Sequence, residues 1–569
     1  MDASIFFVVV GAVAVAAVAR RRGWPAPLLV TVVALAASFL PFVPNISIDG
    51  HVLLNIVLPP LLYSAALDVS FFSFRRSMPQ IRRLGIGLVV VTAVVVGLVA
   101  WWLMPSLTLP GALLLGAIVA PPDAVSAASI GRKLGLPRRV MTVLSGESLI
   151  NDATSLTMFR VFAAVVAGAA AFNLGETIWQ FLLAVIVGVA VGMVFGMVLH
   201  QLRMRVDDPV VNGTFGLLAP FGAYGIAEQL GGSGVLAVVA MGLYVGFNAP
   251  KTSYTNRMQE APLWLSADFL LESFVFAYIG LQLPRVLGDL QDGDVGPIIV
   301  LSLIVLLVVL VVRPAFVYPA DMWGQWWLKQ RLRKWERVAS HQARLPADEA
   351  HRRRQPLTME QVRAQLAETK LSWRDNAVIS WAGMRGVVTL ATALAAADLA
   401  GLDAQAEHAI VVVAFVVTVG TLLLQGLTLP WLIRVLGVVD DKEAQEDARQ
   451  VAAVRQRSRE AGKAYLREMR REWAKEYGED RLPAFDKFAQ RLVRVESDAE
   501  SAQLDDHALP THDELAAMSR KWLSVRRQLL LEERDAGNLS EEVMHELIAA
   551  MDAEELALDA RIATRGPGS

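Results

Sequence analysis

Four polar residues within an apolar stretch of the sequence have the chemistry to bind a cation. Glu147, Ser148, Asn151 and Asp152 lie in the stretch 140–168. At 3.6 residues per turn, Ser148 and Asp152 share one face of a helix, and Glu147 and Asn151 lie on the adjoining face. A charge in hydrocarbon costs about 2.5–3.5 kcal/mol even on the lenient insertion scale, so these residues are functional candidates. The alternative is a buried polar network that only holds helices together.

A second polar position lies where prolines break another apolar stretch. Ala120, Pro121, Pro122 and Asp123 follow one another within the stretch 111–130. Proline removes a backbone donor and disfavours helix at the preceding residue, so we expect the helix to open here. Asp123 then begins the second half-helix, with its carboxylate against the positive end of the helix dipole. The pattern fits an ion site formed by discontinuous helices, and a simple proline kink capped by an aspartate is the alternative.

An arginine marks a third polar position. Arg385 lies between Gly383 and Gly386 in the apolar stretch 376–399. Glycine lets a helix loosen, and an arginine at membrane depth requires a carboxylate partner. We expect Glu147 to be this partner.

Membrane-spanning helices must position these residues, and the sequence contains about thirteen candidates. In the breaks between them, basic residues such as Arg20 to Arg22 cluster after odd-numbered stretches, whereas even-numbered breaks carry little positive charge. The positive-inside bias therefore predicts an outer N-terminus and a cytoplasmic C-terminus. The apolar stretches lie near 3–19, 26–43, 52–71, 84–104, 111–130, 140–168, 178–202, 210–230, 234–249, 264–283, 297–318, 376–399 and 408–436.

The order of these stretches predicts two inverted six-helix repeats. If the first six and the last six stretches are the repeats and the seventh is a linker, the second repeat enters the membrane from the opposite side. The two interrupted stretches, 111–130 and 376–399, then occupy equivalent positions. Inverted repeats with paired broken helices are typical of secondary transporters. The predicted fold class is an all-α integral membrane protein with interrupted helices that cross.

After Val438 the composition changes to frequent Arg, Glu, Asp and Lys with scattered Leu, Met and Trp. This pattern is typical of amphipathic soluble helices. We therefore divide the chain into a transmembrane domain at 1–438 and a cytoplasmic helical tail at 439–569. The tail is expected to regulate transport or aid assembly, and a solvated appendage without a specific ligand is the alternative. The sequence does not identify a regulator.

Composition argues against several other functions. The chain is 54% hydrophobic and 19% charged with a net charge of −2, which does not fit a nucleic-acid binder. It has no cysteine, which excludes disulfides, thiolate catalysis and Cys-ligated zinc. An ATP-binding G-x-x-x-x-G-K-[ST] motif, a Ser/His/Asp grouping and a repeated carbonyl filter are also missing from the sequence. We therefore expect a secondary transporter without a cofactor rather than an enzyme or a channel.

Four ordered motifs connect the sequence to a known family. They are Leu-Pro-Pro-Leu-Leu-Tyr at 58–63, Pro122-Asp123, Gly-Glu-Ser-Leu-Ile-Asn-Asp at 146–152 and Gly-Met-Arg-Gly at 383–386. Together they resemble the monovalent cation:proton antiporters of the NhaP and eukaryotic sodium/proton exchanger type, over roughly residues 1–438. The resemblance implies exchange of Na⁺, or of K⁺ or Li⁺, for H⁺.

The resemblance also implies a role for each site residue. The family's Asn-Asp pair marks electroneutral exchange, which nominates Asp152 as the carrier of cation and proton. Asn151 and Ser148 would lie beside it, and Asp123 with Pro122 would contribute at the crossing. The transported Na⁺ would contact Asp152, Asp123 and Ser148.

The family's Glu and Arg pair matches Glu147 and Arg385, as a structural ion pair rather than an ion ligand. Two positions depart from the family pattern. Relatives often have threonine where this chain has Pro122, and some have an acidic residue where it has Ser64. Both departures affect the coordination shell and the preference for Na⁺ or K⁺.

The family implies an elevator-like movement of a core domain against a dimerisation domain. The core would comprise about 84–168 and 297–436, with the remaining helices forming a homodimer in the lipid. The expected location is the plasma membrane, the inner membrane in a bacterium, and the expected role is pH homeostasis. The alternative is a sodium-coupled symporter of similar architecture, which would need room for an organic solute beside the ion.

Overall fold

The computed structural model shows an all-helical chain in two compact units. Helices are present and strands are absent in the residues that the structure describes, so the predicted all-α class is confirmed, while the two inverted repeats stay a prediction. The first unit comprises Met1–Asn248 and Glu260–Asp440, and the second comprises Ala249–Gln259 and Asp441–Ser569. The described residues are 3–41, 43, 48–168, 174–206, 208–288, 295–342, 370–397, 399–438, 441–483, 485–486, 489–490, 512–535, 539 and 541–563.

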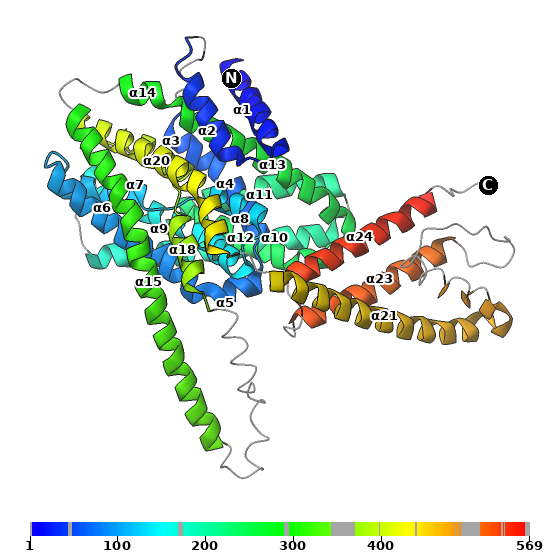
Figure 1. Ribbon diagram of the computed structural model, residues 1–569. Coiled ribbons are helices and arrows are strands. Elements are labelled where there is room, and N and C mark those ends of the chain that lie inside the picture. Colours follow the sequence, from blue (N-terminus) through cyan, green and yellow to red (C-terminus); the bar gives the residue numbers. More distant parts are fainter. Residues whose placement is uncertain are drawn as a thin grey trace. The chain divides into compact units, whose positions relative to one another are not determined.

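The first unit contains the apolar helices, and Figure 1 shows their course along the chain. α13 begins in the second unit and continues into the first. The helices are α1 (Ala3–Arg21), α2 (Ala26–Ala37), α3 (Gly50–Val52), α4 (Leu58–Leu67), α5 (Phe71–Arg82), α6 (Val89–Leu103), α7 (Leu109–Val119), α8 (Ala124–Leu134), α9 (Arg138–Val166), α10 (Leu174–Arg205), α11 (Pro209–Gln229), α12 (Gly234–Asn248), α13 (Tyr254–Leu281), α14 (Leu283–Gly288), α15 (Val295–Gln342), α18 (Trp373–Trp381), α19 (Val387–Ala397) and α20 (Ala404–Leu436). Two π-helical segments, η1 (Leu53–Val57) and η2 (Arg83–Leu88), complete the first unit, and a 3₁₀ turn, η3 (Ala249–Lys251), belongs to the second.

Nine helical segments of the described residues are long and apolar enough to cross a membrane. Three further apolar helices, α2, α7 and α19, are shorter. The transmembrane character predicted from hydropathy is therefore supported, whereas the count of thirteen crossings stays a prediction.

Both interruptions that the sequence predicts are present. Non-helical residues 120–123 separate α7 from α8, and residues 382–386 separate α18 from α19. The first break contains the two prolines, whose rings cannot continue the hydrogen-bond ladder of α7. The second contains two glycines, whose freedom in backbone conformation favours unwinding.

Several helix ends near the site are capped by their own side chains. Thr108 accepts a hydrogen bond from the backbone of Gly111 at 3.3 Å and begins α7. Ser372 and Asp375 form a capping box at the start of α18, with Asp375 N to Ser372 Oγ at 3.1 Å. Such caps satisfy backbone donors that have no partner within the helix and fix where it begins.

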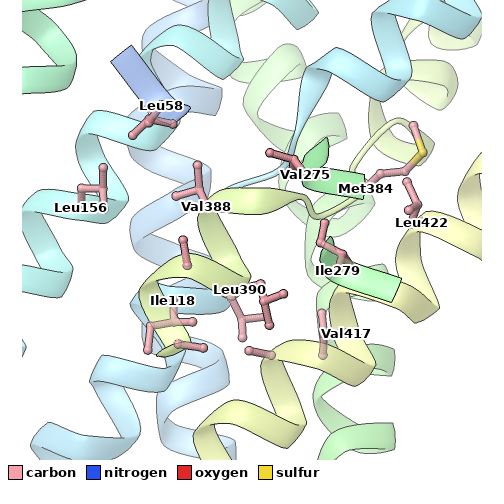
Figure 2. Packing of buried hydrophobic residues seen from close by; sticks show 14 of the residues in the cluster. Leu58, Ile118, Leu156, Val275, Ile279, Met384, Val388, Leu390, Val417 and Leu422 are labelled. Carbon is pink, nitrogen blue, oxygen red and sulfur yellow. The ribbon is translucent and has the colours of Figure 1, made fainter. Parts of the chain in front are cut away.

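Apolar packing surrounds the second interrupted helix. Figure 2 shows side chains of α7, α19 and α20 in one buried cluster, among them Ile118, Leu390 and Val417. Lipid tails are as apolar as these side chains, so close packing rather than removal from water holds helices together inside a membrane. The cluster therefore keeps the broken helices at a defined distance from one another.

The second unit is a helical assembly with its own core. It contains α21 (Asp441–Tyr477), the 3₁₀ turn η4 (Glu479–Arg481), α23 (His512–Asp535) and α24 (Glu541–Ala563). Trp473, Phe485 and Trp522 are among its buried residues. Within this unit Arg257, near the start of α13, pairs with Asp552 of α24, with Nε to Oδ2 at 2.8 Å. The roles predicted for the domains, namely transport, dimerisation and regulation, stay predictions.

Candidate functional site

α9 carries the polar residues that the sequence singles out. Asn151 is fully buried, Glu147 is 2% exposed and Asp152 is 7% exposed, whereas Ser148 is half-buried. These residues lie in the middle of a 29-residue helix, far from either end. The helix therefore holds two carboxylates where neither is freely hydrated.

The two breaks meet beside α9. The backbone N–H of Asp123 donates a hydrogen bond to the carbonyl oxygen of Met384 at 2.6 Å. The Asn151 amide nitrogen donates to the carbonyl oxygen of Pro122 at 2.7 Å. These bonds connect both interrupted helices and α9, so the crossing predicted from the sequence forms in the structure.

Gly386 permits the close approach at the crossing. A Cβ atom at this position would lie 2.6 Å from Cβ of Asp123 and 2.7 Å from its Cγ. Real Cβ atoms do not come this close to other heavy atoms. Glycine at 386 is therefore required for the side chain of Asp123 to pack against the second break.

A cavity of about 170 Å³ joins these elements. Its lining includes Ser148, Asp152, Pro122, Asp123 and Gly386. The structure therefore brings together every residue predicted to bind the ion except Asn151, which contacts Pro122 beside the cavity. The remaining charged residues of the described lining are Asp68, Arg132, Asp268 and Glu272.

The charges in this cavity are strongly unequal. Five carboxylates and a single guanidinium belong to its described lining. Low-dielectric walls of one charge sign focus the field and raise the local concentration of counter-ions. Carboxylate and hydroxyl oxygens are also the ligands that hard cations prefer. The arrangement can therefore attract and bind a small cation.

The ion pair of Glu147 differs from the sequence prediction. Glu147 pairs with Arg313 of α15, with Oε1 to Nη1 at 2.6 Å and Oε2 to Nη2 at 2.8 Å. Arg313 Nε also donates to the carbonyl oxygen of Ile379 at 3.0 Å. A bidentate pair satisfies both carboxylate oxygens, so the predicted partner Arg385 is replaced here by Arg313.

Arg385 is instead held by backbone carbonyls of the breaks. Its Nε donates to Val119 at 3.0 Å, its Nη2 donates to Ala120 at 3.3 Å and its Nη1 donates to Gly383. The carbonyls at the end of α7 lack partners within their helix, and their partial negative charge suits a cation. Arg385 therefore neutralises the negative end of α7 and has no hydrogen bond to a carboxylate among the described residues.

Two residues of the site, Arg313 and Asp268, did not receive a role from the sequence, and Glu272 was expected to be structural rather than an ion contact. Arg313 lies in the apolar stretch 297–318, so its charge inside a span is a signal that could have identified it. Asp268 and Glu272 are separated by one helical turn on α13 and both line the cavity. The one-turn spacing of these two carboxylates is visible in the sequence. The sequence does not show that they line the same cavity as Asp152. Ser64, at the position of a family acid, donates a hydrogen bond to Asp268.

Comparison with known proteins gives consistent matches. A family model described as "Sodium/hydrogen exchanger, transmembrane" matches residues 5–435. An uncharacterised Na⁺/H⁺ exchanger of Mycobacterium tuberculosis is 31% identical over 577 residues, which cover 98% of this chain and 97% of the relative. The Na⁺/H⁺ antiporter ApNhaP of Aphanothece halophytica is 29% identical over 423 residues, 74% of this chain and 71% of the relative.

A solved structure is also similar in fold. The sodium proton antiporter MjNhaP1 from Methanocaldococcus jannaschii at pH 8 matches with a TM-score of 0.55 and 17% identity. The match covers 76% of this chain and 98% of that one. The helical arrangement is thus shared with a solved membrane protein.

Proposed function

The chain belongs to the sodium/hydrogen exchanger family of cation:proton antiporters, and we propose that Asp152 is the group that carries cation and proton in turn. A monovalent cation and a proton compete for one carboxylate. On one side of the membrane Na⁺ displaces H⁺, and on the other side H⁺ displaces Na⁺. The two ion gradients supply the free energy.

One observation supports this role above the others. Asp152 is 7% exposed, lines the cavity and has neither a hydrogen-bond donor nor a cationic partner among the described residues. A buried carboxylate without a partner is unfavourable unless it binds a proton or a cation. Glu147, by contrast, is already neutralised by Arg313 and is not a carrier.

The neighbours of Asp152 complete a coordination shell. Ser148 and Asp123 line the same cavity, and Ser148 lies one turn before Asp152 on α9. Asn151 uses its amide nitrogen on Pro122, while its Oδ1 receives no hydrogen bond from the described residues. We propose that Asp152, Asp123 and Ser148 contact the transported Na⁺, and that Asn151 keeps the Pro122 carbonyl in place.

Exchange through one carboxylate is electroneutral. Asp152 has the same total charge whether it carries one proton or one Na⁺, and Asn151 adds no titrating group. Each cycle then moves one cation against one proton with no net charge. The rate should therefore not depend on an imposed membrane potential.

The two walls of the cavity suggest how access alternates. Two groups of helices line the cavity, and we call them its two walls: α8, α9 and α19 are connected by the hydrogen bonds at the crossing, and α4 and α13 are connected by the hydrogen bond of Ser64 to Asp268. We propose that the first set moves as a core against the second, in an elevator-like transition. Arg132 in the last turn of α8 lines the cavity, and the positive-inside bias supports a cytoplasmic position for this end of α8, so we propose that the cavity opens to the cytoplasm.

The same bias supports an outer N-terminus and a cytoplasmic tail in a plasma membrane. We further propose a homodimer, which holds one set of helices still while the core moves. A sodium-coupled symporter is not favoured, because the curated relatives are named as exchangers and antiporters of Na⁺ and H⁺.

The decisive experiment replaces Asp152 with Asn in proteoliposomes. Cation-dependent proton movement should be lost for Na⁺, K⁺ and Li⁺, because the amide cannot carry either ion. Thr154→Val is the matched control on the same helix: among the described residues its hydroxyl bonds only to Ile150 O of α9, at 3.0 Å, and exchange should persist. Robust exchange by Asp152→Asn would disprove the carrier role, and a wild-type rate that follows an imposed potential would disprove electroneutrality.

A further inference from the structure

Asp268 places a carboxylate in the cation cavity from a helix outside the crossing. It lies on α13, which is neither α9 nor part of an interrupted helix. Glu272 lines the same cavity one turn further along α13. Acidic groups therefore reach the cavity from both walls, those of the proposed moving core and those of the facing helices.

Ser64 of α4 orients Asp268. The Ser64 hydroxyl, 5% exposed, donates a hydrogen bond to Oδ2 of Asp268. The other oxygen, Oδ1, is buried and has no hydrogen-bond partner among the described residues. Burying a polar oxygen without a partner is unfavourable, so a cation that reaches this carboxylate would supply the partner that Oδ1 lacks.

A second observation indicates that the ligand is a cation. Asp152 faces the same cavity, is more than nine-tenths buried and has no donor among the described residues. The single arginine of the described lining, Arg132, cannot neutralise five carboxylates. A mobile cation that enters the cavity would meet Asp268 on one wall and Asp152 on the other.

We propose that Asp268 is a second cation ligand of the transport path, oriented by Ser64, which takes up a monovalent cation before Asp152 binds it. The inference rests on the proposed antiport function. Ser64 occupies Oδ2, so Oδ1 contacts the cation. Because α13 belongs to the facing wall, Asp268 raises cation occupancy in the open cavity and does not travel with the core.

The test measures the Na⁺ dependence of exchange in proteoliposomes at fixed pH on both sides. Asp268→Asn conserves shape but removes the charge. The half-saturating Na⁺ concentration should rise about tenfold, equivalent to about 1.4 kcal/mol, while the maximal rate falls less than about threefold. Asp403→Asn is the control: Asp403 is an exposed carboxylate at the start of α20 and does not belong to the described lining of the cavity, so the change should stay below about twofold.

Moving the carboxylate from position 268 to position 64 distinguishes a cation ligand from a structural residue. Combining Ser64→Asp with Asp268→Asn moves the carboxylate across the same hydrogen bond and should return the half-saturating concentration to within about threefold of wild type. Ser64→Ala alone should raise it about threefold, because Asp268 loses its orientation. This single change also serves as the test if Asp268→Asn does not yield folded protein.

The outcomes distinguish this inference from the proposed function. If Asp152→Asn is inactive but Asp268→Asn has the Na⁺ dependence of wild type, Asp268 is not a ligand and the carrier role stands. If Asp268→Asn lowers only the melting temperature, or if the relocated carboxylate restores nothing, Asp268 is structural. If Asp152→Asn still exchanges ions, the carrier assignment itself is wrong.

Discussion

The buried pair of Glu147 and Arg313 allows a quantitative test of the structure. Both residues are 2% exposed, and their two hydrogen bonds of 2.6 and 2.8 Å connect α9 to α15. Removing one partner of such a pair costs about 3–5 kcal/mol, because the other charge is left buried and unpaired. Glu147→Gln and Arg313→Gln should therefore each lower the free energy of unfolding by about this amount.

The double variant reveals the coupling. If the two sites were independent, the losses of the single variants would add, and the free energy of unfolding would fall by about 6–10 kcal/mol. If the two charges neutralise each other, the double variant leaves no charge buried without a partner. Its loss in the free energy of unfolding should therefore be close to that of one single variant. The coupling free energy is then about 3–5 kcal/mol, well above the roughly 0.5 kcal/mol within which distant sites add.

Thermal unfolding of the four proteins in detergent measures this coupling. A second cycle with Glu147→Gln and Arg385→Gln is the matched control, since Arg385 bonds to backbone carbonyls instead of to Glu147. We expect a clearly smaller coupling in this control. A coupling between Glu147 and Arg313 that is no larger than that between Glu147 and Arg385 would refute the assignment of the pair.

Two further changes test the crossing and the tail. Gly386→Ala adds a Cβ atom 2.6 Å from Asp123 Cβ, so exchange in proteoliposomes should fall at least about tenfold. Circular dichroism should show unchanged helix content. Exchange at the wild-type rate would contradict the tight contact. Ending the chain after Asp440 removes Asp552, the partner of Arg257, and should leave a membrane-inserted dimer with an altered pH or cation dependence of transport. Loss of assembly on size exclusion would instead make the tail an obligate part of the fold.

The sequence by itself determined the features that depend on local chemistry. Long apolar stretches identify membrane helices because a span needs about 20 apolar residues to cross hydrocarbon. Pro121 and Pro122 identify the first break because proline has no backbone donor, and Gly383 and Gly386 indicate the second in a similar way. Glu147 and Asp152 are identified as functional candidates because a carboxylate is rare within an apolar helix, whereas the choice of Asp152 as carrier comes from the resemblance to the antiporter family.

Tertiary structure decided which of these groups meet. Glu147 is separated from Arg313 by 166 positions and from Arg385 by 238, and nothing local favours one guanidinium over the other. Ser64 and Asp268 are 204 positions apart, yet they share a hydrogen bond. Apolar helices in lipid resemble one another in composition, so hydropathy does not say which faces pack together. The partner of each buried charge follows from that packing, and only the assembled helices reveal it.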